Sequence, residues 1–249
     1  MNYSTFDQFE ITRIIPFHPF GNLDLSFTNS ALFLLIALFI INSLFNANVK
    51  NGYIVPGRWQ SVLEIIYDTI YNVIKDNIGS AGNHYFPFVI TIFLFIAVLN
   101  MVGIVPYTFS PTAHLVITFS LSLSIWLGCT ILGLKNYRSD FFSMFMPAGS
   151  PLALAPFLVL IELVSYVAKA ITLGVRLAAN ITAGHLLFAI LAGFTWKLFI
   201  AAGFIKLISI FPMLIVIFIT ILEAAVAIIQ AYVFSLLTTS YLNDTVHLH

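Results

Sequence analysis

The chain has 249 residues, of which 60% are hydrophobic and only 8% are charged, and its mean hydropathy is +1.02. A water-soluble domain carries about 25% charged residues, so this composition excludes a soluble globule and predicts an integral membrane protein. Ten basic and ten acidic residues give a formal net charge of zero, which argues against nucleic acid as a partner. The apolar runs are long and continuous, whereas a membrane barrel needs alternating segments of about 10 residues. The predicted fold class is therefore all-α.

The first half of the chain is predicted to contain three membrane-crossing helices and one surface helix. A polar arm, residues 1–25, precedes an apolar run at 26–46, which is close to the ~20 residues that a spanning helix needs. Residues 56–78 alternate charged and apolar side chains with a helical period, so this helix is expected to lie on the membrane surface. Two further spans are expected at 85–106 and 114–134.

Two unusually long helices are expected near the end of the chain, at 151–196 and 204–243. The first would be about 69 Å long at ~1.5 Å per residue, more than twice the ~30 Å hydrocarbon thickness. We therefore expect both helices to cross with a steep tilt, or to bend at Gly174 and Gly184. No internal repeat is visible, and the spans are predicted to form a single membrane domain, residues 1–249.

Basic residues predict how the spans are oriented, because loops rich in lysine and arginine usually face the inner side. The basic residues that follow the first and third spans are Lys50, Arg58, Lys75, Lys135 and Arg138. With the surface helix left uncrossed, the N-terminus is expected outside and, after five crossings, the C-terminus inside. Lys197 and Lys206 in the last outer loop run against this tendency.

Ionisable residues inside the two long helices are the strongest functional signal. At about 100° per residue, four polar residues of the first helix fall within an arc of roughly 40°; they are Glu162, Lys169, Arg176 and Asn180. His185 lies on a different face of this helix. On the second helix, Glu223, Gln230, Tyr241 and Asp244 lie within roughly 60° of one another. Charged groups at membrane depth are costly and face a bundle interior or a water path. The alternative interpretation is that these residues form structural ion pairs between the two helices. A row of four polar groups along one face, however, is more than such pairing requires.

The run Arg176-Leu-Ala-Ala-Asn180-Ile-Thr-Ala-Gly184-His185 resembles the signature of the a subunits of F-type ATP synthases, in their mitochondrial, fungal-like form. Further runs that match this family are Pro106-Tyr-Thr-Phe-Ser, Ala113-His114-Leu, Trp126-Leu-Gly and Tyr241-Leu-Asn-Asp244, together with Glu223 and Gln230. The resemblance covers essentially the whole chain. One departure is Lys169, where some members have arginine, although either residue supplies a positive charge.

The resemblance implies that the chain is the proton-translocating stator of the membrane (Fo) sector, beside a rotating ring of c subunits. Arg176 would separate two offset half-channels, because a guanidinium cannot be deprotonated and so never relays a proton. Glu223 and His185 would form the outer path, with Asn180 and Gln230 as polar groups near the ring. The inner path would contain Glu162 and Asp244, with Lys169 in the same row.

Partners and location follow from the same resemblance. The partners would be the c-ring, the other Fo and peripheral-stalk subunits, lipid and protons, in the mitochondrial inner membrane. The N-terminus would face the intermembrane space and the C-terminus the matrix. The chain would couple proton flow to ATP synthesis without a catalytic site or cofactor of its own. The second interpretation is a secondary proton or cation antiporter, although such folds usually show internal repeats and broken helices.

A few polar residues remain outside this scheme. His185 and Glu223 together could bind an inhibitory Zn²⁺, whereas no physiological metal is expected, because a structural zinc site takes four ligands. Asn100 could line a path or cap a neighbouring helix. His84 and His114 lie at the edges of spans and are expected to be interfacial, and the roles of His247 and His249 stay open.

Overall fold

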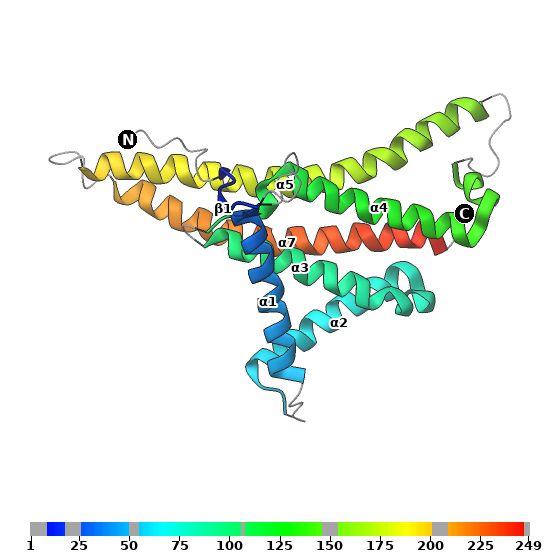
Figure 1. Ribbon diagram of the computed structural model, residues 1–249, viewed down its shortest axis with the longest axis horizontal. Coiled ribbons are helices and arrows are strands. Elements are labelled where there is room, and N and C mark those ends of the chain that lie inside the picture. The colour runs from blue at the N-terminus through cyan, green and yellow to red at the C-terminus, as the bar shows by residue number, and fades with distance from the viewer. Residues whose placement is uncertain are drawn as a thin grey trace. The chain divides into compact units, whose positions relative to one another are not determined.

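The computed structural model describes residues 9–17, 26–49, 55–105, 108–145, 154–200 and 209–246, most of which are helical (Figure 1). Among these residues, five helical stretches are long and apolar enough to cross a membrane. They are Asn29–Asn46, Arg58–Ile104, Leu115–Tyr137, Ala155–Ile200 and Ile210–Val246. The predicted all-α membrane fold is confirmed. In a bilayer this is the expected solution, since a helix satisfies its own backbone hydrogen bonds where no water is present.

The arm before the first helix has a structure that the sequence did not predict. Two short strands, β1 (Arg13–Ile15) and β2 (Phe27–Thr28), pair antiparallel just before helix α1 (Asn29–Val49) begins. The backbone N–H of Asn29 donates to the Thr12 carbonyl at 3.1 Å, and its side-chain amide donates to the Glu10 carbonyl at 3.1 Å. Asn29 therefore ties the arm to the first turn of α1.

The amphipathic segment forms helix α2 (Arg58–Ile78), which is followed by the 3₁₀ helix η2 (Gly79–Tyr85) and helix α3 (Phe86–Ile104). The end of α2 is set by Gly79, whose φ of 74° lies in the left-handed region that a side chain disfavours. The apolar face of α2 is buried through Ile70, Val73, Ile74 and Ile78. Its position on the membrane surface stays a prediction.

Helix α4 (Leu115–Tyr137) lies between two 3₁₀ helices, η3 (Pro111–Ala113) and η4 (Arg138–Phe145). Phe141 and Phe145 of η4 pack with Tyr166 into a buried aromatic cluster, and the ring of Trp126 lies 5.3 Å from that of Tyr166. Cys129 is 2% exposed and thus lies in the core of this region.

The two long helices are α5 (Ala155–Ile200), with 46 residues, and α7 (Ile210–Val246), with 37 residues. At ~1.5 Å per residue they are about 69 Å and about 56 Å long, well above the ~30 Å of a hydrocarbon core. Helix α5 continues through both Gly174 and Gly184. The predicted tilt stays a prediction, as does the single-domain assignment.

The chain folds into two compact units. The first unit consists of Met1–Leu44, Phe95–His114 and Leu177–Ala231. The second unit consists of Phe45–Leu94, Leu115–Arg176 and Tyr232–His249. Helices α1, α3, α5 and α7 contribute residues to both units, so each unit is built from pieces that are distant in the sequence.

Gly174 is a point of close approach between α5 and α4 in the second unit. A Cβ atom at this position would lie 2.5 Å from the Ser122 hydroxyl oxygen, 2.9 Å from the Phe119 Cα and 3.0 Å from the Thr118 carbonyl oxygen. Two of these three atoms belong to the backbone, which cannot move aside as a flexible side chain does. Small residues allow such helix packing in membranes, so Gly174 fixes the spacing of these helices.

We expect Gly174→Ala to destabilise the protein by about 1–3 kcal/mol, the usual cost of overpacking a tight contact. Gly193→Ala is the matched control, because this residue lies on the same helix and a Cβ there would meet no atom within 4 Å. The measurement is the thermal inactivation of each variant in detergent. Equal midpoints for the two variants would contradict a close α4–α5 contact.

Candidate functional site

In the first unit, one face of α7 contains the buried residues Glu223, Ala227 and Gln230, which we call the polar line. These residues follow one another at helical spacing and are 8%, 0% and 6% exposed. Asn100 of α3 donates from its side-chain amide to the Ala227 carbonyl at 3.3 Å, and Asn180 of α5 donates to the Gln230 side-chain oxygen at 3.5 Å. The line thus brings together side chains from three helices.

Four polar atoms of this unit are buried and have no hydrogen-bond partner among the described residues. They are Oδ1 of Asn100, Nε2 of His185, Oε1 of Glu223 and Nε2 of Gln230. More than about 90% of buried polar groups in proteins are hydrogen-bonded, and a buried water typically satisfies those that lack a protein partner. These four atoms come from three helices, α3, α5 and α7.

Gly184 lets Glu223 approach helix α5. A Cβ at position 184 would lie 2.7 Å from Oε1 of Glu223 and 3.0 Å from its carboxyl carbon. The absence of a side chain therefore leaves room for the carboxyl group directly beside the backbone that precedes His185. The structure thus places the Glu223 carboxyl group next to the Gly184-His185 pair.

The residues around η3 anchor α5 in the same unit. Thr182 of α5 donates to the Ala113 carbonyl at 3.0 Å. His114 stacks on Phe109 with ring centroids 5.1 Å apart, and burial lowers the pKa of His114 below its usual value of 6.5.

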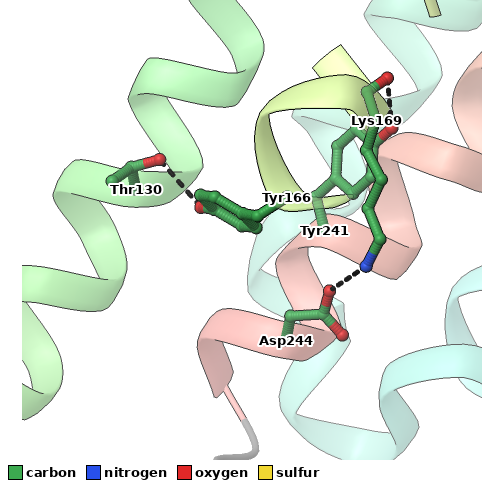
Figure 2. A network of polar contacts seen from close by, with 5 residues as sticks. All are labelled: Thr130, Tyr166, Lys169, Tyr241 and Asp244. Carbon is green, nitrogen blue, oxygen red and sulfur yellow. Dashed lines mark hydrogen bonds and ion pairs between the residues drawn. The ribbon is translucent and has the colours of Figure 1, made fainter. Parts of the chain in front are cut away.

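The second unit contains another set of polar contacts, shown in Figure 2. Lys169 of α5 forms an ion pair with Asp244 of α7, at 3.6 Å between Nζ and Oδ2. Tyr241 donates its hydroxyl to the Lys169 carbonyl at 3.0 Å. One turn earlier on α5, the hydroxyl of Tyr166 lies 2.8 Å from that of Thr130 on α4. These contacts join three helices at two successive turns of α5.

Glu162 and Arg176 also belong to this unit and lie on α5. Glu162 is partly exposed and Arg176 is exposed. The row predicted on the first long helix therefore divides between the units: Glu162, Lys169 and Arg176 are in the second, and Asn180 is in the first.

The remaining predicted residues are placed as follows. His84 is exposed in η2, beside Tyr85, and lies in neither polar set. His247 and His249 fall outside the described residues. Within the described part of the chain, no three histidine, cysteine or acidic residues are grouped to hold a metal ion.

Two of the contacts that the sequence did not predict lie at the polar residues of the first unit. The ring of Phe9 in the N-terminal arm lies 6.0 Å from that of His185, edge to face at 84°. The bond from Asn100 to Ala227 joins residues that are 127 positions apart. Asn100 stands alone in an apolar run, which gave a hint of its contact with Ala227. No pattern in the N-terminal arm indicated the contact of Phe9 with His185.

Comparison with known proteins tests the family resemblance that the sequence suggested. The family model of ATP synthase A chains matches residues 29–243. The ATP synthase subunit a of Metridium senile is 51% identical over 249 residues, covering 100% of both chains. That of Chondrus crispus is 43% identical over 246 residues, covering 99% of this chain and 97% of the relative. That of the fungus Mycosarcoma maydis is 42% identical over 249 residues, covering 99% and 98%.

These matches cover the residues that suggested the family from the sequence, including the Arg176 to His185 run. They extend over nearly the whole length of the relatives as well as of this chain. The chain therefore belongs to the ATP synthase A chain family.

Proposed function

We propose that this chain is the proton-translocating stator subunit of the Fo sector of an F-type ATP synthase, working against a ring of c subunits. The observation that supports this best is the division of its polar residues. One unit holds His185, Glu223, Gln230 and their unsatisfied atoms, and the other holds a separate charged set. The boundary between the units on α5 falls directly after Arg176.

The outer path is formed by the polar line of the first unit. Water held by the unsatisfied atoms of His185, Glu223 and Gln230 would let a proton pass from group to group. Glu223 and His185 can each take up and release a proton, while Asn180 and Gln230 supply hydrogen bonds near the ring. The hydrogen bond from Asn180 of α5 to Gln230 of α7 holds the two side-chain amides next to each other.

The inner path is formed by Glu162 and Asp244 of the second unit. The side chains of Lys169 and Asp244 form an ion pair and are 42% and 22% exposed on this chain. Charged groups at membrane depth are retained where they face a bundle interior or a water path, and we assign this pair to the inner path. Tyr241 fixes the backbone of Lys169 on the same side.

Arg176 separates the two paths. It is exposed on a long apolar helix, where a charge is costly unless a partner meets it. A c-ring carboxylate passing this position would be held ionised by the guanidinium, which itself cannot release a proton. A lysine would serve less well, since burial lowers the pKa of an ammonium group. The proton is therefore forced onto the ring between the outer and inner paths.

The location and partners belong to the same proposal. The chain crosses the mitochondrial inner membrane with its N-terminus in the intermembrane space and its C-terminus in the matrix. It contacts the c-ring and other Fo and peripheral-stalk subunits, and it has no catalytic site of its own. Membership of the ATP synthase family favours this function over a secondary antiporter.

Replacement of Arg176 by alanine is expected to abolish proton-driven ATP synthesis, because the carboxylate on the ring loses its counter-charge and the two paths are no longer separated. The measurement is ATP synthesis in inner-membrane vesicles, together with the amount of chain bound to the c-ring. Lys197→Ala is the matched control, since it removes another cation from the same helix. Substantial coupled synthesis in an assembled Arg176→Ala enzyme would rule out this role.

Zn²⁺ added from the outer side is expected to inhibit proton flow weakly and reversibly by bridging His185 and Glu223. Two protein ligands make an incomplete site compared with the usual four, and protonation of the imidazole at low pH should relieve the inhibition. Proton flow is measured as a function of zinc concentration and pH. The control is His84→Ala, which removes an exposed histidine outside both polar sets and should leave zinc sensitivity as it is. Unchanged zinc sensitivity in His185→Ala with Glu223→Gln would place the zinc elsewhere.

Residues next to Glu223 and Glu162 are expected to be reached from opposite sides of the membrane. In a Cys129→Ser background, Ala224→Cys should react with a membrane-impermeant thiol reagent added outside, and Leu163→Cys with reagent added inside. A single continuous water path would dissipate the proton gradient, so the two sites must open to different faces. Labelling of both introduced cysteines from the same side would contradict the two-path mechanism.

A further inference from the structure

The N-terminal arm contacts His185 through one aromatic side chain. The rings of Phe9 and His185 have centroids 6.0 Å apart and planes at 84°, which is the edge-to-face arrangement that aromatic pairs favour. Both residues belong to the first unit, and His185 belongs to its buried polar set. The contact therefore joins the arm to the group proposed to take up protons from the outer side.

Along the described stretch 9–17 of the arm, burial is confined to Phe9. This residue is partly buried, whereas every residue from 10 to 17 is exposed. Ile15 and Phe17, for example, are each 59% exposed. A segment that folded back only to shield apolar surface would cover these apolar side chains as well.

Backbone hydrogen bonds next to Phe9 hold the arm in place. The side chain of Asn29 donates to the carbonyl of Glu10, the residue directly after Phe9. Two residues further on, the Thr12 carbonyl accepts from the Asn29 backbone, and the pairing of β1 with β2 continues the connection. The position of Phe9 is thus tied to the start of α1 and does not depend on the ring contact alone.

Two contacts lie next to the His185 imidazole. Phe9 is in edge-to-face ring contact with it, and the preceding residue, Gly184, lies against the Glu223 carboxyl group. The Nε2 atom is buried without a partner among the described residues. Phe9 is therefore one of the groups packed around a buried imidazole.

We propose that Phe9 is a positioning residue for proton uptake: it closes one side of the outer path at His185 and fixes the orientation of the imidazole. This inference rests on the proposed function, because it assigns the arm a task at the same outer path. Phe9 lines one side of the outer path, and its aromatic ring restricts the approach of water and dissolved reagents to His185.

The test measures access to position 185 in the assembled ATP synthase. His185→Cys is introduced in a Cys129→Ser background, and the rate of reaction with a membrane-impermeant thiol reagent added outside is followed in inner-membrane vesicles. Phe9→Ala should raise this rate several-fold, because it removes the covering ring. Phe9→Tyr keeps the ring and should leave the rate unchanged. Phe17→Ala is the matched control, since it removes an exposed ring from the same arm, and it should also leave the rate unchanged.

The outcomes separate this inference from the proposed function. An unchanged rate in Phe9→Ala, with the introduced cysteine still labelled from outside, overturns the role of Phe9 and leaves the outer path intact. An equal rise in Phe17→Ala also overturns it, since the effect would then belong to the arm in general. No labelling from outside in any variant overturns both the inference and the outer path. If Phe9→Ala does not assemble, Phe9→Leu replaces it, and an unchanged rate there overturns the inference.

Discussion

The structure depends on one constraint: inside a bilayer, a polar group must find its partner within the protein or in water that the protein encloses. The helix backbones meet this condition by themselves, and most side chains on them are apolar. The few polar side chains do not, and the fold gathers them. Asn100 and Asn180 converge on α7 in one unit, and Lys169 and Tyr241 meet in the other. Glu223 Oε1 is one of the buried atoms that have no hydrogen-bond partner within the described part of the chain.

Close helix packing makes this gathering possible, and glycine permits it at two places with different consequences. At Gly174 the missing side chain lets α4 and α5 approach until backbone atoms nearly touch, which serves packing. At Gly184 the missing side chain makes room for the Glu223 carboxyl group, which serves the site. In the first case a larger residue would push the helices apart, and in the second it would displace the Glu223 carboxyl group.

The proposed function would place Arg176 against a neighbouring subunit. Arg176 is exposed on an apolar helix, so its charge is best compensated by an acidic group on a neighbouring subunit. Other polar side chains meet partners within their own unit: Lys169 pairs with Asp244, and Asn180 donates to Gln230.

The sequence by itself determined the membrane class, the long apolar helices and the polar row from Glu162 to Asn180, because hydropathy and helical period are local properties. The Arg176 to His185 run also pointed to the family, which the comparisons confirm. Only the tertiary structure decided that Lys169 pairs with Asp244 and that Asn100 meets the Ala227 carbonyl. It alone placed Phe9 against His185. These contacts join distant segments, and their geometry depends on how whole helices pack, which no local pattern encodes.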